Sequence, residues 1–215
     1  SRFTRVDSDV IDRLIAKEEH KEANLESNQR EILSSVFRSQ LPQIKKVEFN
    51  VETQALGENG APIMITQSEY MRRMKEMANI QAGMSFYGEM PNMYNLVLNA
   101  DHKLVKQVLT DADNSCKAAL EPIESEMANL NNRRKELQKA QEGKKTEDIP
   151  QAEKDELNDI EKKISDETTK KQAVLGEYAN GNKIIHQLID LALLQNNMLK
   201  GEALTNFVKR SIELI

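Results

Sequence analysis

Apolar positions along the first hundred residues change between the spacing of helices and the spacing of strands. Helical spacing runs over residues 7–41, where Asp7 or Ser8 is placed to cap the start and Pro42 to stop the helix. Residues 47–51 and 94–98 alternate apolar with polar side chains, and residues 63–65 form a short apolar run, as strands do. The pattern predicts an α+β fold with a small three-stranded sheet and packed helices.

Two more helices are predicted around the third strand. Thr66 and Glu69 form a capping-box pattern, so a helix is expected over residues 67–82. After the strand, Asp101 is placed to cap a helix that carries Leu104 and Val108 on one side. These helices supply the apolar faces that the small sheet needs.

A highly charged segment follows, from about residue 114 to residue 180. It holds 12 Lys and Arg and 15 Asp and Glu, and its apolar residues recur in steps of three and four. A break near Gly143 and Pro150 divides it, which predicts a long antiparallel helical hairpin with its tip near residues 144–149. Disorder is the alternative, because Arg134, Glu167 and Lys171 occupy seam positions.

The last two predicted helices, over residues 182–198 and 202–215, are amphipathic and end the chain. Few aromatic residues are available elsewhere to cover them, so the simplest cover is a second copy of the chain. We expect a homodimer in which the two helices of each chain form a four-helix bundle. Its predicted interface residues are Ile184, Leu188, Leu191, Ala192, Leu204, Phe207, Val208 and Ile212.

Composition and charge narrow the possible functions. A net charge of −5 argues against nucleic-acid binding, and no apolar run is long enough for a membrane span. One cysteine, Cys116, excludes an internal disulfide and fits the cytoplasm. The three histidines lack metal-ligand spacing, and no nucleophile has a neighbouring base. We therefore expect no catalytic residues and no metal site; an enzyme with a disguised site is kept only as a remote alternative.

Methionine is concentrated in one stretch, because seven of the nine methionines fall within residues 64–93. Flexible, polarisable side chains suit a surface that adapts to many apolar partners. They also fill gaps in a core that is poor in aromatic residues, and composition alone favours that second interpretation.

Several segments, in this order along the chain, resemble the C-terminal part of the heat-shock protein 90 family of chaperones, in its bacterial form. Ala100 stands where the family usually has proline. The segments that carry the resemblance are residues 3–9, Ala61 with Pro62, residues 68–77, residues 98–105, residues 188–194 and residues 207–210.

The resemblance implies a C-terminal dimerisation and client-binding domain, formed by residues 1–113 and 180–215, with residues 114–179 as an inserted arm. ATP and magnesium would then bind only in an N-terminal domain that this chain lacks, so the fragment should not be an ATPase. The chain also lacks the acidic tail that recruits co-chaperones. Unfolded proteins would bind the helix over residues 67–82, through Tyr70, Met71, Met74, Met77 and Ile80.

A second function from a different class remains open. The charged arm is also typical of a structural coiled-coil adaptor that binds one fixed protein partner. Client binding would depend on the methionine-rich helix, whereas adaptor binding would depend on the arm.

Overall fold

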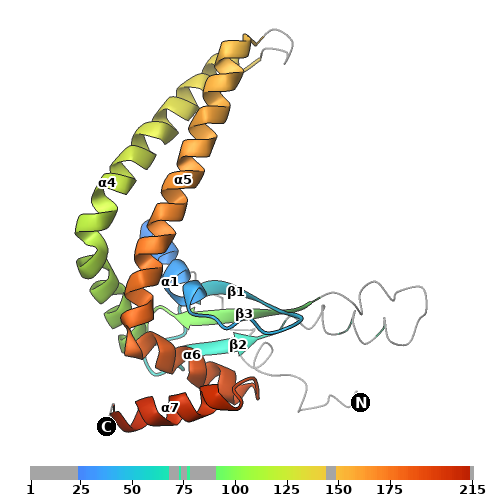
Figure 1. Ribbon diagram of the computed structural model, residues 1–215, viewed down its shortest axis with the longest axis vertical. Helices are drawn as coiled ribbons and strands as arrows, with labels where there is room; N and C mark the ends of the chain where they lie inside the picture. The colour runs from blue at the N-terminus through green and yellow to red at the C-terminus, as the bar shows by residue number, and fades with distance from the viewer. Residues whose placement is uncertain (1–23, 68–72, 74–76, 78–90, 144–148, 214–215) are drawn as a thin grey trace.

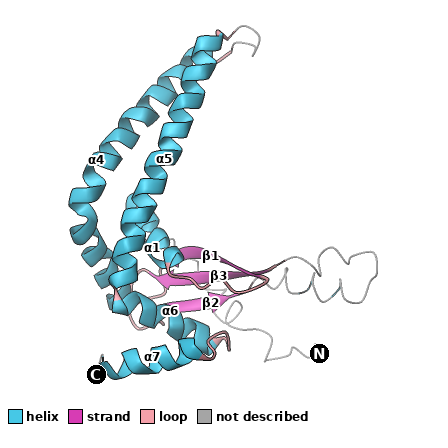
Figure 2. Cartoon of the chain, viewed as in Figure 1, coloured by secondary structure: helices cyan, strands magenta, loops and turns pink. Residues whose placement is uncertain are grey.

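The computed structural model describes residues 24–67, 73, 77, 91–143 and 149–213. Figure 1 and Figure 2 show a small sheet packed against helices, with a long helical hairpin projecting from it. The predicted α+β class is confirmed. The elements are α1 (Ser27–Ser39), β1 (Val47–Gln54), β2 (Ile63–Thr66), β3 (Asn92–Asn99), α4 (Lys103–Gln141), α5 (Gln151–Gly181), α6 (Lys183–Gln195) and α7 (Glu202–Glu213).

The three strands form one mixed sheet in the order β1-β3-β2. Strand β3 lies in the centre, parallel to β1 and antiparallel to β2. Its alternate residues Leu96 and Leu98 are fully buried, and Val51 and Ile65 pair with Leu96 from the two sides. The period-two pattern in the sequence therefore selected the correct face for the core.

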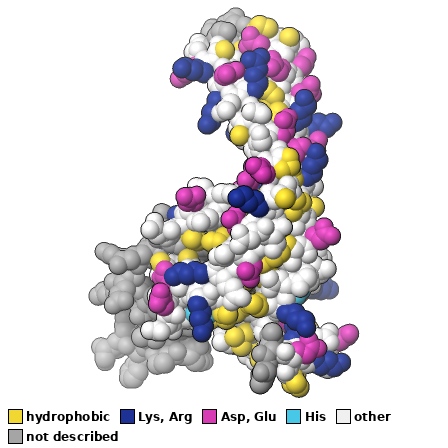
Figure 3. Space-filling model, turned by 90° about the vertical axis from the view of Figure 1, so that its left-hand side faces the viewer, with side chains coloured by type: hydrophobic (Ala, Val, Ile, Leu, Met, Phe, Trp, Pro, Cys, Tyr) yellow, Lys and Arg dark blue, Asp and Glu magenta, His cyan; other side chains and the backbone are white. Residues whose placement is uncertain are grey.

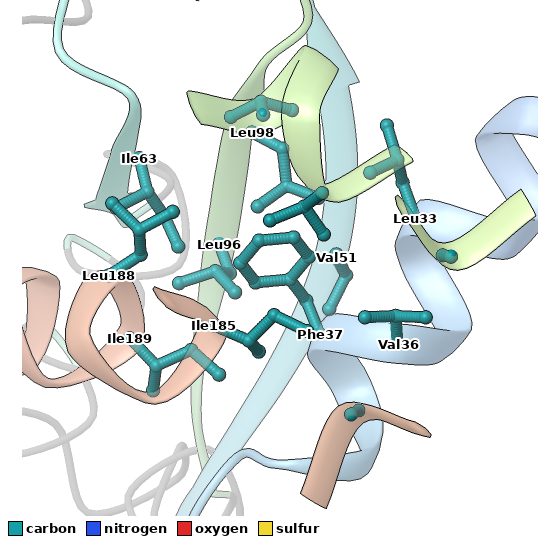
Figure 4. Packing of buried hydrophobic residues seen from close by; sticks show 14 of the residues in the cluster. Leu33, Val36, Phe37, Val51, Ile63, Leu96, Leu98, Ile185, Leu188 and Ile189 are labelled. Atoms are coloured by element: carbon teal, nitrogen blue, oxygen red, sulfur yellow. The ribbon is translucent and has the colours of Figure 1, made fainter. Parts of the chain in front are cut away.

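The main core lies between this face of the sheet and helices α1, α4, α5 and α6. Figure 4 shows Phe37 of α1 in the middle of the cluster, with Val51 and Leu96 from the sheet and Ile185 and Leu188 from α6 around it. The Phe37 side chain is completely buried. Segments that are far apart in the sequence thus share one core.

The predicted helix start at Asp7 or Ser8 lies outside the described residues, and the predicted cap of the helix after the third strand is wrong. Helix α1 begins at Ser27, where Glu26 and Gln29 form a capping box, so no helix continues through residues 24–26; residues 1–23 lie outside the described part of the chain. Helix α4 is capped by His102, whose Nδ1 accepts a hydrogen bond from the Leu104 N–H at 3.2 Å. Asp101 instead accepts a hydrogen bond from Gly57.

The charged segment forms the predicted antiparallel hairpin, in which α4 and α5 pack along each other (Figure 1). The hairpin seam is apolar in the distal part, where Leu130, Leu137 and Ile160 form a small cluster with Ile164 against it. The expected boundary at residue 114 is not visible in α4, which is one continuous helix from the sheet outward.

The base of the hairpin belongs to the main core. Cys116 and Leu120 of α4 and Leu175 and Ala179 of α5 are buried members of that cluster, and α1 packs against α5. The composition of the segment predicted an arm that begins at residue 114 and ends at residue 179. In the structure, Leu120 of α4 and Leu175 of α5 still belong to the main core. Only the part of the arm that lies farther from the sheet than these two residues is separate from that core.

Candidate interaction surface

Helix α7 carries the largest exposed apolar stripe among the described residues. Leu204, Val208 and Ile212 are 36%, 47% and 70% exposed. A spacing of four residues places them on one face of the helix. Figure 3 shows hydrophobic side chains at the foot of the molecule, while charged side chains of both signs follow the arm. Among the large exposed hydrophobic residues that the structure describes, these three lie on one helix face.

A row of polar contacts fixes α7 against α6. Lys183 pairs with Glu213 at 2.7 Å, Gln187 Nε2 donates to Ser211 Oγ at 2.6 Å, and Arg210 pairs with Asp190. The three α6 residues are spaced by four and three, so the row follows one face of that helix. It sets the rotation of α7 about its own axis.

This rotation decides which side of α7 meets solvent. Phe207 is half-buried and packs against the main core, whereas the apolar stripe points elsewhere and stays uncovered. In a helix that was free to rotate, apolar contact with α6 would bury the stripe. With the polar contacts formed, Leu204, Val208 and Ile212 stay exposed.

The ion pair between Asp190 and Arg210 orients α7 more than it stabilises the fold. Burial raises the pKa of the Asp190 carboxyl above its usual value, and the Arg210 guanidinium opposes this shift only in part. The folded chain therefore holds the ionised carboxylate at a cost, as partly buried ion pairs often do. At the exposed end of the row, the hydrogen bond from Lys183 lowers the pKa of Glu213.

The predicted interface residues of α6 lie mostly inside the chain. Leu188 and Ala192 are buried in the main core, Ile184 packs against that core, and Leu191 is half-exposed. Leu194, which the sequence did not single out, is 37% exposed. Of the predicted set, Leu204, Val208 and Ile212 of α7 are exposed, whereas Phe207 packs against the main core.

The predicted client-binding helix lies largely outside the described residues. Tyr70, Met71, Met74 and Ile80 are not described. Met77 is in helical conformation and 43% exposed. In β3, Met93 is 44% exposed. The only sequence signal for this residue was its place in the methionine-rich stretch.

The family-like motif around Asn99 has a structural role. Asn99 is fully buried; its Oδ1 accepts hydrogen bonds from the N–H groups of Leu56 and Asp101 at 3.1 Å, and its Nδ2 donates to the Gly57 carbonyl at 2.8 Å. Its side chain thus ties the loop after β1 to the start of α4. The motif is satisfied within the chain and needs no ligand to explain it.

The described residues do not assemble a reaction centre. No group of three or more His, Cys, Asp or Glu among them is placed to hold a metal ion. Burial raises the pKa of the Cys116 thiol, which opposes formation of a reactive thiolate. A search of the same residues also finds no helix with the length and apolar character of a membrane span.

Comparison with known proteins identifies the class. The chain is 68% identical over all 215 residues to chaperone protein HtpG of Bacteroides fragilis and 66% identical to that of Bacteroides thetaiotaomicron. It is 44% identical over 217 residues to HtpG of Porphyromonas gingivalis. No family model and no solved structure matches the chain.

This likeness extends from one end of the chain to the other, and the chain spans about a third of the length of these relatives (32%, 32% and 31%). Over its full length the chain is therefore similar to one segment of chaperones of the heat-shock protein 90 class. Within that class it belongs to the bacterial HtpG family, as the ordered motifs in its sequence had predicted.

Proposed function

We propose that this segment is the dimerisation and client-binding module of an HtpG chaperone in the cytoplasm. The observation that carries the proposal is the apolar stripe of α7, which the contacts with α6 leave open to solvent. In this proposal, ATP and magnesium bind in other parts of the whole chaperone, and the segment itself is not an ATPase.

A second copy of the chain is the occupant that best fits the stripe. A two-fold axis would bring Leu204, Val208 and Ile212 against their own counterparts, so one surface supplies both halves of the contact. Helix α7 lies at the foot of the molecule, at the end opposite the tip of the hairpin (Figure 1), so two copies can meet there without collision of the tips of their arms. A stable contact of this kind buries about 800 Å² per chain.

A single charge in the stripe tests dimerisation. Val208→Glu changes a side chain that is 47% exposed, so the stability of a single chain should change by less than about 0.5 kcal/mol. In a dimer the same carboxylate would be buried without a partner, and we expect monomers in analytical ultracentrifugation at micromolar concentration.

The matched control is Asn206→Glu, which adds the same charge to an exposed residue on the opposite side of α7. It should leave the dimer intact. If both variants sediment as dimers, the interface does not include this stripe; if both are monomers, the effect is one of net charge and the proposed contact is also wrong.

Client binding is the second part of the proposal and is supported by Met77. An exposed methionine in helical conformation forgoes about 1.5–3 kcal/mol of possible burial, which is reasonable where a partner covers it transiently. We expect Met74→Ser with Met77→Ser to weaken binding of an unfolded substrate and to leave the unfolding free energy nearly unchanged. A loss of about 2–5 kcal/mol in stability would instead identify both residues as core.

The adaptor alternative is less well supported. The large exposed hydrophobic residues among those described are Met77, Met93, Leu194, Leu204, Val208 and Ile212, and none of them lies in α4 or α5. Protein contacts usually centre on buried apolar anchors, and the described part of the arm offers none.

A further inference from the structure

A polar region divides the arm, about a third of the way from the sheet to the tip. Below this region Leu120 and Leu175 belong to the main core, and above it Leu130 and Ile160 belong to a separate distal cluster. Between them lies a surface hollow of about 610 Å³, lined only by polar and charged residues: Glu126, Lys163, Asp166, Glu167, Thr169 and Lys170. Apolar packing along the seam is therefore interrupted.

Both helices carry local features that weaken their hydrogen bonding near this level. In α4, Pro122 has no N–H for the carbonyl of Ala118, and Figure 1 shows α4 bowed away from α5 over its middle part. In α5, the hydroxyl of Thr168 donates to the Ile164 carbonyl at 2.7 Å and that of Thr169 donates to the Ser165 carbonyl at 2.9 Å. Such bonds to the preceding turn favour bending.

One buried lysine joins three helices at the same place. Lys171 of α5 is 4% exposed, and its Nζ lies 2.9 Å from Asn28 Oδ1, 3.0 Å from Glu31 Oε2 and 3.1 Å from Glu124 Oε1. Asn28 and Glu31 belong to α1, and Glu124 belongs to α4. A charge so deeply buried is stable only when it is paired, so its partners are held in one geometry.

We propose that the arm is jointed at this polar region. The contacts of Lys171, which lie within the polar region, hold the joint in the orientation seen in Figure 1. When these contacts are broken, the distal hairpin, from about residue 128 of α4 to about residue 166 of α5, moves as a unit relative to the sheet. The distal cluster keeps the hairpin intact during this motion, because its apolar residues pack only with each other. Motion is confined to the region where apolar contact is absent.

Distances between spin labels test the joint in the full 215-residue chain. One pair of labels, at Glu48→Cys and Asp159→Cys, spans the joint, and a second pair, at Lys135→Cys and Asp159→Cys, lies within the distal hairpin; all three residues are exposed. Cys116 can stay, because it is 3% exposed and its raised pKa slows labelling. Dilution with unlabelled chain restricts the measurement to distances within one chain.

The native chain should give one narrow distance for each pair. Lys171→Met should broaden the Glu48–Asp159 distribution and leave the Lys135–Asp159 distribution narrow. The control Lys162→Met, which removes an exposed lysine of the same helix, should change neither. An unchanged Glu48–Asp159 distribution in Lys171→Met would show a rigid arm, and broadening of both pairs would show a hairpin that melts; either result overturns the proposal.

A second variant keeps the test decisive if Lys171→Met does not fold. Pro122→Ala adds a backbone N–H that can donate to the carbonyl of Ala118, and it removes the clash of the proline ring with that carbonyl. Helix α4 should therefore straighten. The mean Glu48–Asp159 distance should then shift, while the Lys135–Asp159 distance stays the same. No shift would contradict a joint at this level.

Discussion

At the scale of single residues, buried polar groups organise this segment. Asn99 ties the loop after β1 to α4, and Lys171 ties α5 to α1 and α4. Each is buried and has polar partners from other elements, which favours one arrangement of the chain. Their roles depend on contacts between residues far apart in the sequence.

Gly60 shows how closely the loop packs on Asn99. A Cβ atom at this position would lie 2.7 Å from the Leu56 carbonyl oxygen and 2.9 Å from Asn99 Nδ2. We expect Gly60→Ala to lower the unfolding free energy by about 1–3 kcal/mol, measured by urea denaturation.

The control for this prediction is Gly181→Ala, at the end of α5, where no atom lies within 4 Å of the added carbon. Alanine there should be neutral or stabilising by up to about 1 kcal/mol, because glycine lowers helix stability. Equal effects of the two substitutions would mean that the loop does not hold the contact with Asn99.

At the scale of elements, the hairpin is partly core and partly separate. Replacing residues 128–166 by a short Gly/Ser link removes only the distal cluster, and the remaining segment should unfold cooperatively near the midpoint of the intact chain in thermal denaturation. Replacing residues 115–179 also removes Cys116, Leu120 and Leu175 from the main core.

The longer replacement should abolish cooperative unfolding. Deletion of one large buried side chain typically costs about 2–5 kcal/mol, and a whole domain is stable by only about 5–15 kcal/mol. Similar cooperative transitions for both shortened chains would show that the base of the arm contributes little to the core, as the charge of the segment had first indicated.

At the scale of the whole molecule, apolar surface is distributed unequally between its parts. The arm satisfies its own apolar residues and presents charges of both signs, while α7 presents an uncovered stripe at the foot (Figure 3). Helix α6 contacts both the main core and α7. One of its faces enters the main core, and another carries the polar row that contacts α7. This distribution supports the proposal that self-association takes place at the foot rather than along the arm.

The sequence by itself determined which elements form. Alternation identified two of the strands and a short apolar run identified the third, over residues 63–65. Steps of three and four identified the hairpin, because local backbone geometry fixes both periods. Ordered motifs identified the family in the same way, since they depend only on residue order. The exact cap of α4 was missed, because Asp101 is of a type that favours the N-cap and His102 is not, and only the structure shows that Asp101 accepts from Gly57 while His102 accepts from Leu104.

Only the tertiary structure decided what each apolar or charged position contacts. Leu188 of α6 and Val208 of α7 both lie on amphipathic helices, yet one is buried against the sheet and the other is exposed. Likewise, the charge of Lys171 argued against a packed hairpin, until Glu31 and Glu124 from two other helices proved to surround it. Burial is a property of neighbours brought together by the fold, and the periodicity of one helix carries no information about which neighbours those are.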